Sequence, residues 1–177
     1  MARHPEIERR LHTEVNRVLK GAPATHASLP RLELTQRIIT ETLRLYPPAW
    51  LLTRTVTAAT RLGGHMLPAG TGVAYSPYLI HHRPDLYDQP ETFDPDRWNS
   101  PHLPPPRHAV IPFAAGARKC IGDTYAMTEA ILALATITSR WRPDHLPGQR
   151  IRPALGTTLR PSKLHMCATP RSAIEQT

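Results

Sequence analysis

The chain has little lysine and few aromatic residues for a basic protein. Its 177 residues carry a formal net charge of +8, yet only three of the 22 basic residues are lysine, and aromatic residues make up 6% of the chain. The arginines are dispersed, so the sequence lacks the dense basic runs with interleaved aromatics that are typical of nucleic-acid-binding surfaces. We therefore expect no nucleic-acid partner, which leaves anionic lipid or an acidic protein as partners for the positive charge.

Cysteine and long apolar runs are scarce as well. The two cysteines, Cys120 and Cys167, lie far apart without C-x-x-C spacing, which excludes a disulfide framework and the usual zinc sites. The most apolar stretch, residues 126–139, is too short to span a membrane and contains Glu129. The first residues, Met1–Glu6, are charged and do not form a signal peptide. We expect a soluble, cytoplasmic protein without a membrane span.

Proline, by contrast, is abundant: its 20 residues predict many loops between short elements. Apolar residues at helical spacing predict three helices, over residues 5–20, 32–45 and 121–140. Pro47-Pro48 must end the second helix, because proline cannot continue it. The proline-rich stretch 99–112 is expected to be a functional loop.

Short β-like segments alternate with glycine and proline turns. They are expected at residues 52–56, 61–66, 71–75, 151–155 and 164–168. The segment 61–66 is predicted to form a tight hairpin around Gly63-Gly64, and the last two segments are predicted to join through residues 156–158. With no internal repeat and no second domain, the fold class is expected to be mainly α with small β-sheets in one domain.

The strongest chemical signal is a glycine-bearing loop that brings Cys120 to the start of the third predicted helix. Helix N-terminal amides, together with Arg118 and Lys119, favour a thiolate at that position. A thiolate is a metal ligand, and a lone cysteine suits an iron whose other positions come from a macrocycle. The alternative for any lone cysteine is a buried, inert residue.

The sequence of this loop decides between the two interpretations. Its pattern F-x-x-G-x-R-x-C-x-G resembles the haem-binding loop of the cytochrome P450 family, the haem-thiolate monooxygenases. All the fixed positions match, at Phe113, Gly116, Arg118, Cys120 and Gly122. The resemblance implies that these residues bind haem b (iron protoporphyrin IX), with Cys120 as the axial ligand of the iron and the catalytic residue.

A second set of residues resembles a structural network of the family. Glu41 and Arg44 match its E-x-x-R motif, and Arg97 matches the arginine of its F-x-P-x-R-[FW] segment. At the spacing i,i+3, Glu41 and Arg44 share a helix face and can pair. The alternative is a solvated surface ion pair of little energetic value. The resemblance implies a Glu41–Arg44–Arg97 network that holds a loop behind the haem.

Other residues gain expected roles from their positions in the family. Arg54 and Arg118 are expected to bind the haem propionates, since the arginine fork donates two hydrogen bonds to a carboxylate, although a surface role is the alternative. The adjacent His81 and His82 are interpreted as structural or solvated rather than as metal ligands. Two segments are expected to line the substrate, or else to be ordinary turn and core residues; they comprise Ala49, Trp50, Leu51 and Leu52 in one and Thr157 and Thr158 in the other.

The resemblance implies O₂-dependent monooxygenation of a hydrophobic small molecule. Electrons would come from NAD(P)H through an acidic redox partner such as a ferredoxin, docked near Lys119 on the Cys120 face. The tracts 43–76 and 78–98 are closest in texture to bacterial members that act on terpenoids or other hydrophobic metabolites.

One family motif is missing from the sequence. The segment [AG]-G-x-[DE]-T of the helix that lies over the haem has no match in the chain. We therefore expect residues 1–177 to be the C-terminal, haem-proximal fragment of one P450 domain, without the distal helix and the N-terminal half, and inactive on its own. The alternative is a non-catalytic remnant that at most binds haem.

Overall fold

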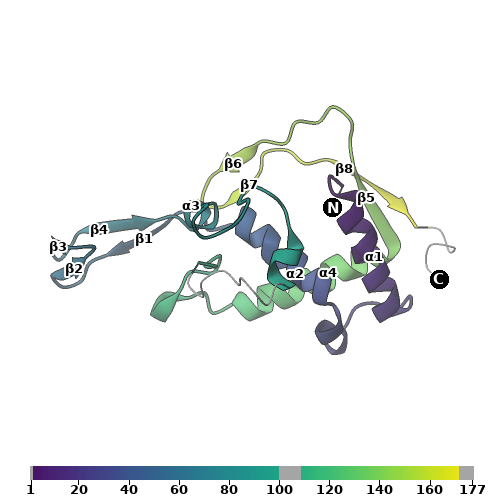
Figure 1. Ribbon diagram of the computed structural model, residues 1–177, viewed down its shortest axis with the longest axis horizontal. Coiled ribbons are helices and arrows are strands. Elements are labelled where there is room, and N and C mark those ends of the chain that lie inside the picture. Colours follow the sequence, from purple (N-terminus) through teal and green to yellow (C-terminus); the bar gives the residue numbers. More distant parts are fainter. Residues whose placement is uncertain (1, 100–108, 172–177) are drawn as a thin grey trace.

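Three helices form the centre of the molecule (Figure 1). The computed structural model describes residues 2–99 and 109–171. Helix α1 spans Pro5–Leu19, α2 spans Glu33–Leu45 and α4 spans Asp123–Arg140, so the predicted helices are confirmed to within two residues at each end. A short 3₁₀ helix, η1 (His26–Arg31), lies between α1 and α2.

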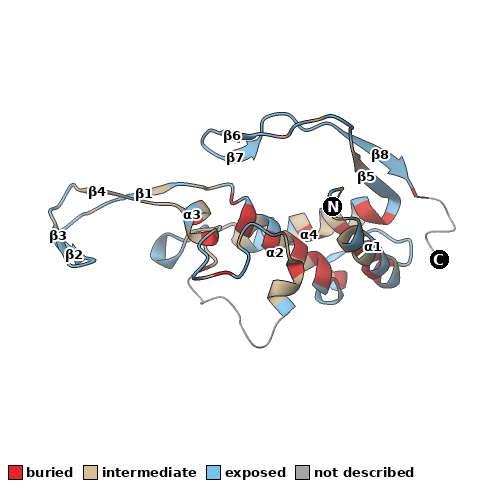
Figure 2. Ribbon diagram, turned by 45° about the horizontal axis from the view of Figure 1, so that its top comes forward, coloured by how far each residue is buried: buried red, intermediate tan, exposed pale blue. Residues whose placement is uncertain are grey.

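The core lies where these helices meet. Leu11 and Val15 of α1, Ile38 of α2, and Ile131 and Ala135 of α4 are buried against one another. Figure 2 shows the buried residues gathered on the helices, while the strands are mostly exposed. Each helix contributes an apolar stripe at helical spacing, which accounts for the success of the periodicity prediction.

The start of α2 is held by an acidic side chain from α1. The Glu14 carboxylate accepts hydrogen bonds from the backbone amides of Leu34 (2.7 Å) and Thr35 (2.9 Å), and from the Thr35 hydroxyl (2.7 Å). Amides in the first turn of a helix have no partner within the helix, so a buried carboxylate is a strong cap for them. Nothing in the sequence pattern had indicated this contact.

A long β-arm projects from the helices (Figure 1). Strand β1 (Leu52–Thr55) pairs antiparallel with β4 (Gly72–Tyr75), and at the tip β2 (Thr60–Leu62) pairs with β3 (His65–Leu67). The tip turns at Gly63 and Gly64, both at positive φ, as the hairpin prediction required. Helix α3 (Pro77–His81), which was not predicted, follows β4. Its N-cap is Ser76, whose hydroxyl accepts a hydrogen bond from the Leu79 amide.

The tail corrects the predicted strand pairing. The segment 151–155 was expected to join 164–168 through residues 156–158. Instead β6 (Pro153–Leu155) pairs with β7 (Leu159–Pro161), and β8 (Met166–Pro170) pairs with β5 (Trp141–His145). Strand β5 escaped prediction because it follows α4 without a turn and contains Pro143, a residue that only an edge strand tolerates.

Two short 3₁₀ helices complete the described chain: η2 (Pro95–Asn99) and η3 (Gly116–Arg118). Residues 100–108 of the predicted loop 99–112 lie outside the described residues. In the part of the chain that the structure describes, every sheet is two-stranded, and no helix is long and apolar enough to cross a membrane. The fold is thus one of helices with small sheets.

Candidate functional site

A buried ion pair occupies the last turns of α2. Arg44 donates to Glu41 through Nε (2.9 Å to Oε2) and Nη2 (2.8 Å to Oε1), and both side chains are completely buried. The spacing i,i+3 places them on one face of the helix, where the guanidinium and the carboxylate meet in parallel. The burial excludes the solvated surface pair that the spacing alone left open.

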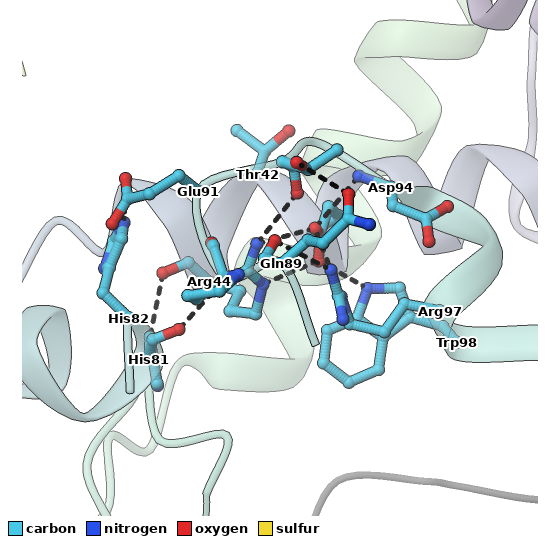
Figure 3. Close-up of polar contacts among 12 residues, drawn as sticks. Thr42, Arg44, His81, His82, Gln89, Glu91, Asp94, Arg97 and Trp98 are labelled. Carbon is cyan, nitrogen blue, oxygen red and sulfur yellow. Dashed lines mark hydrogen bonds and ion pairs between the residues drawn. The ribbon is translucent and has the colours of Figure 1, made fainter. Parts of the chain in front are cut away.

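The segment around η2 contacts Glu41 through Asp94, Arg97 and Trp98, three residues that Figure 3 shows near Arg44. The Trp98 indole donates to Oε2 at 3.1 Å, the Asp94 amide donates to Oε1 at 3.1 Å, and Arg97 Nε lies 3.6 Å from Oε1. Arg97 also donates to the Asp88 carbonyl at 2.7 Å. The structure therefore brings Glu41, Arg44 and Arg97 together. Trp98 was missed as a member, although it directly follows Arg97 in the motif.

Arg44 uses its remaining donors on backbone carbonyls. Nη1 donates to His81 (2.8 Å) and to Pro90 (2.7 Å), and Nη2 donates to Thr92 (3.2 Å). The guanidinium also lies 5.0 Å from the centre of the Tyr87 ring. The buried guanidinium thus binds the chain from residue 81 to residue 92 to α2. The Glu41 carboxylate and the three carbonyl oxygens compensate its positive charge.

His81, the first residue of the histidine pair, is fully buried between three segments. Its Nδ1 lies 3.0 Å from the Arg44 carbonyl, and its Nε2 accepts a hydrogen bond from the Ile111 amide at 2.9 Å. Burial lowers the pKa of His81 to about 4, and the charges of Arg44 and His82 act in the same direction. His82, by contrast, makes a local contact: its Nδ1 lies 2.7 Å from the carbonyl of Tyr78, four residues earlier.

The cysteine loop is closed by its own backbone. The Cys120 amide donates to the Phe113 carbonyl at 2.9 Å, and the Lys119 amide donates to Gly116 at 3.0 Å. Gly116 has φ +70°, a left-handed conformation that glycine adopts without strain. Cys120 follows η3 and precedes α4, whose first residue is Asp123. Lys119 forms an ion pair with Asp123.

The surroundings of Cys120 fit a haem group bound by a single thiolate. The side chain is exposed, and residues 115–121 are exposed with it, so a flat ligand can reach the sulfur. A Cβ at Gly122 would lie 3.8 Å from Sγ, in van der Waals contact, so glycine leaves more room beside the sulfur than any other residue. No cluster of three metal-binding side chains occurs among the described residues. An iron held by a macrocycle can take a single thiolate from the protein, which a lone exposed cysteine can supply.

The two arginines expected at the propionates lie on different elements. Arg54 projects from β1, where it donates to the Thr53 carbonyl at 2.8 Å and to the Tyr75 hydroxyl at 3.3 Å. Arg118 ends η3 in the cysteine loop. Both are exposed. Both guanidinium groups are thus accessible to carboxylates.

The two segments expected to line the substrate meet in space. The Trp50 indole donates to the Gly156 carbonyl at 3.0 Å, and the Leu159 amide donates to the Pro48 carbonyl at 2.9 Å. These bonds hold the turn that carries Thr157 and Thr158 against the segment that carries Ala49, Leu51 and Leu52. The threonines and Leu51 are exposed, whereas Ala49, Trp50 and Leu52 are partly buried.

The chain matches known proteins over nearly its whole length. A family model described as cytochrome P450 matches residues 1–168. Cyclooctatin synthase from Streptomyces melanosporofaciens is 48% identical over 97% of this chain and 38% of its own length. Pentalenene oxygenase from Streptomyces avermitilis is 47% identical over 97% of this chain and 39% of its own length. The chain therefore spans less than half the length of these curated relatives.

Proposed function

Because the chain belongs to the cytochrome P450 family, we propose that it supplies the thiolate side of the haem site of a monooxygenase. The observation that carries the proposal is Cys120, exposed in a backbone-closed loop beside Gly122. The predicted resemblance to bacterial members is confirmed by the Streptomyces relatives.

In this proposal Cys120 is the iron ligand, and Phe113, Gly116, Arg118 and Gly122 border the cofactor. When bound, haem supplies the activation of O₂ and one-electron redox chemistry. The chain's own residues position it: the thiolate fixes the iron, and the forks of Arg54 and Arg118 bind the propionates.

We further propose a hydrophobic small molecule as the substrate. One relative is named pentalenene oxygenase. Another, from Streptomyces melanosporofaciens, is 48% identical over 88% of this chain and 32% of its own length and is named cyclooctat-9-en-7-ol 5-monooxygenase. The segments 48–52 and 156–159 are joined by two hydrogen bonds and carry the exposed Leu51 and the hydroxyls of Thr157 and Thr158. Small-molecule sites combine apolar side chains with a few polar groups in this way.

Electrons are proposed to come from NAD(P)H through an acidic partner such as a ferredoxin, which would dock on the Cys120 face beside Lys119 and Arg118. We place the protein in the cytoplasm. This placement rests on the low cysteine content of the sequence, in which Cys120 and Cys167 lie far apart.

Haem binding without catalysis is the second candidate. On α4, Tyr125 is 73% exposed and Ile137 is 52% exposed, so one apolar face of this helix is uncovered in the 177-residue chain. Exposed apolar patches favour aggregation or partner binding. We therefore propose that these residues alone do not couple electron transfer to product formation.

Haem titration of the purified chain tests the ligand assignment. After reduction and addition of CO, thiolate ligation gives a red-shifted ferrous–CO band. We expect Cys120→Ser to abolish this band and Cys167→Ser, the matched control in β8, to retain it. A band that survives in Cys120→Ser, or its absence from the wild-type chain, would refute the assignment. Product and peroxide yields with a ferredoxin, its reductase and a panel of terpenoids then distinguish catalysis from haem binding alone.

A further inference from the structure

We propose that neutral His81 is a positioning residue for the cysteine loop, and that its protonation releases the segment that leads into this loop. The effect on the iron ligand rests on the proposed haem-thiolate function, whereas the effect on the loop does not. The inference comes from the position of His81, which joins the end of α2 to a segment 30 residues farther along the chain.

The hydrogen bonds of the ring define its protonation state. The Ile111 amide is a donor, so Nε2, at 2.9 Å from it, must accept. The Arg44 carbonyl is an acceptor, so Nδ1, at 3.0 Å from it, must carry the hydrogen. Only the neutral Nδ1–H tautomer satisfies both bonds. A proton on Nε2 would face the Ile111 amide donor to donor, and that bond would be lost.

Backbone hydrogen bonds link the segment that begins at Ile111 to Cys120. The Ile111 carbonyl accepts from the Ala114 amide at 3.1 Å, and the Phe113 carbonyl accepts from the Cys120 amide at 2.9 Å. A second anchor lies just before it, where the Tyr87 hydroxyl donates to the Ala109 carbonyl at 2.8 Å. His81 and Tyr87 therefore hold the entry of the loop, and only the His81 anchor depends on a group that titrates in the acidic range.

The charges around His81 oppose its protonation. From α2, Arg44 donates to the His81 carbonyl, and its partner Glu41 is engaged by Arg44, Arg97 and Trp98. At the end of α3, His82 lies 3.7 Å from Glu91 and adds a positive influence on the ring. The loop that follows α3 contributes Tyr87, and burial raises the pKa of its hydroxyl to about 12.

Within the described residues no carboxylate bonds to the His81 ring. A proton on the ring therefore gains no new acceptor and meets the cationic Arg44 side chain. Burial and this charge outweigh the bond from Nδ1 to the Arg44 carbonyl, which acts to raise the pKa of His81. The folded pKa of about 4 against the ordinary 6.5 means that the opened segment takes up the proton first. Local opening at His81 should accordingly become about 30-fold more favourable between pH 7.5 and pH 5.

Amide hydrogen exchange on the full chain without haem tests the inference directly. Rates are corrected for the intrinsic effect of pH, and peptides covering residues 109–114 are compared with peptides covering residues 11–19 of α1. We expect protection of 109–114 to fall about 30-fold between pH 7.5 and pH 5 while α1 keeps its protection. Unchanged protection of 109–114, or an equal loss in α1, would overturn the proposal.

Two variants separate the titration of His81 from a general structural role. In His81→Gln the amide oxygen can still accept from Ile111 but does not titrate, so we expect protection of 109–114 that no longer depends on pH. His82→Gln is the matched control, since its ring contacts the Tyr78 carbonyl of α3. Its influence is the smallest of those that act on the His81 ring, so this variant should keep a pH profile close to that of the wild type. An acid-induced loss that persists in His81→Gln contradicts the proposal. If His81→Gln does not fold, the wild-type and His82→Gln profiles decide.

The haem-loaded chain provides the spectroscopic readout. On acidification the red-shifted ferrous–CO band should be lost at a higher pH in the wild type than in His81→Gln. If both proteins show the thiolate band and lose it at the same pH, the proposed function stands and the role of His81 in positioning the ligand is refuted. A chain without any thiolate band, but with the predicted exchange profile, would refute the proposed function and retain the loop anchor.

Discussion

Removal of the Glu41 carboxylate should be among the most destabilising single changes in this chain. Glu41→Ala takes away the acceptor of two Arg44 bonds, of the Trp98 indole and of the Asp94 amide. Breaking a buried ion pair from one side costs ~3–5 kcal/mol, because the remaining charge stays buried and uncompensated. The orphaned indole and amide each add about 1 kcal/mol or more.

One feature of the structure limits this loss. Arg44 keeps the carbonyls of His81, Pro90 and Thr92 as acceptors, so its cation is not left bare. We therefore expect a total of about 4 kcal/mol, which is a large part of the ~5–15 kcal/mol that stabilises a typical domain. Glu41→Ala should give little soluble protein, and what remains should unfold at a much lower urea concentration.

The matched control is an ion pair of the same spacing on the surface. Arg9 pairs with Glu6 at i,i+3 with a shortest distance of 2.7 Å, but their side chains are 68% and 65% exposed. Glu6→Ala should change the free energy of unfolding by less than about 1 kcal/mol. Urea unfolding, followed by far-ultraviolet circular dichroism, measures both variants. A Glu41→Ala protein as stable as Glu6→Ala would refute the argument from burial.

Three further predictions concern other parts of the fold. Glu14→Ala, which leaves the first amides of α2 without their cap, should cost ~2 kcal/mol in urea unfolding; an unchanged midpoint contradicts it. Protonation of His81 should remove about 2.5 kcal/mol of stability between pH 6.5 and pH 4, because the unfolded chain binds the proton first, and His81→Gln should lack this part of the loss. Gly116→Ala should cost ~1 kcal/mol from its φ of +70°, whereas Gly72→Ala, equally free of neighbours but without positive φ, serves as the control for thermal unfolding.

The helices and the β-arm could be predicted because their signals are local. The apolar spacing of α1 and α2, and the prolines after Leu45, act within a few residues of each other. The hairpin at Gly63-Gly64 is likewise set by two adjacent residues that favour positive φ. The tail was mispaired because β5 and β8 lie 20 or more residues apart and no turn residue marks the start of β5.

In the candidate site too, local features could be predicted from the sequence, whereas contacts between distant residues could not. The spacing of Glu41 and Arg44 predicted a shared helix face, and the motif predicted Arg97, but neither specified the burial of the pair. Burial comes from the chain around residues 81–98, which folds back over α2 and is 37 or more positions away from Arg44. The roles of Glu14 and His81 also depend on such distant partners, so the sequence could not reveal them.

These contacts make α2 the element through which the distant parts of the site are related. Glu14 fixes its first turn, Glu41 and Arg44 anchor the chain from residue 81 to residue 98 on its last turns, and the Arg44 carbonyl orients His81. His81 in turn holds Ile111 at the entry to the cysteine loop. Arg44 thus has two structural roles. Its guanidinium neutralises Glu41, and its carbonyl accepts the hydrogen on Nδ1 of His81 and so selects the tautomer of that ring. Displacement of the last turn of α2 would therefore be felt at Ile111, because the intervening hydrogen bonds share residues and do not act independently.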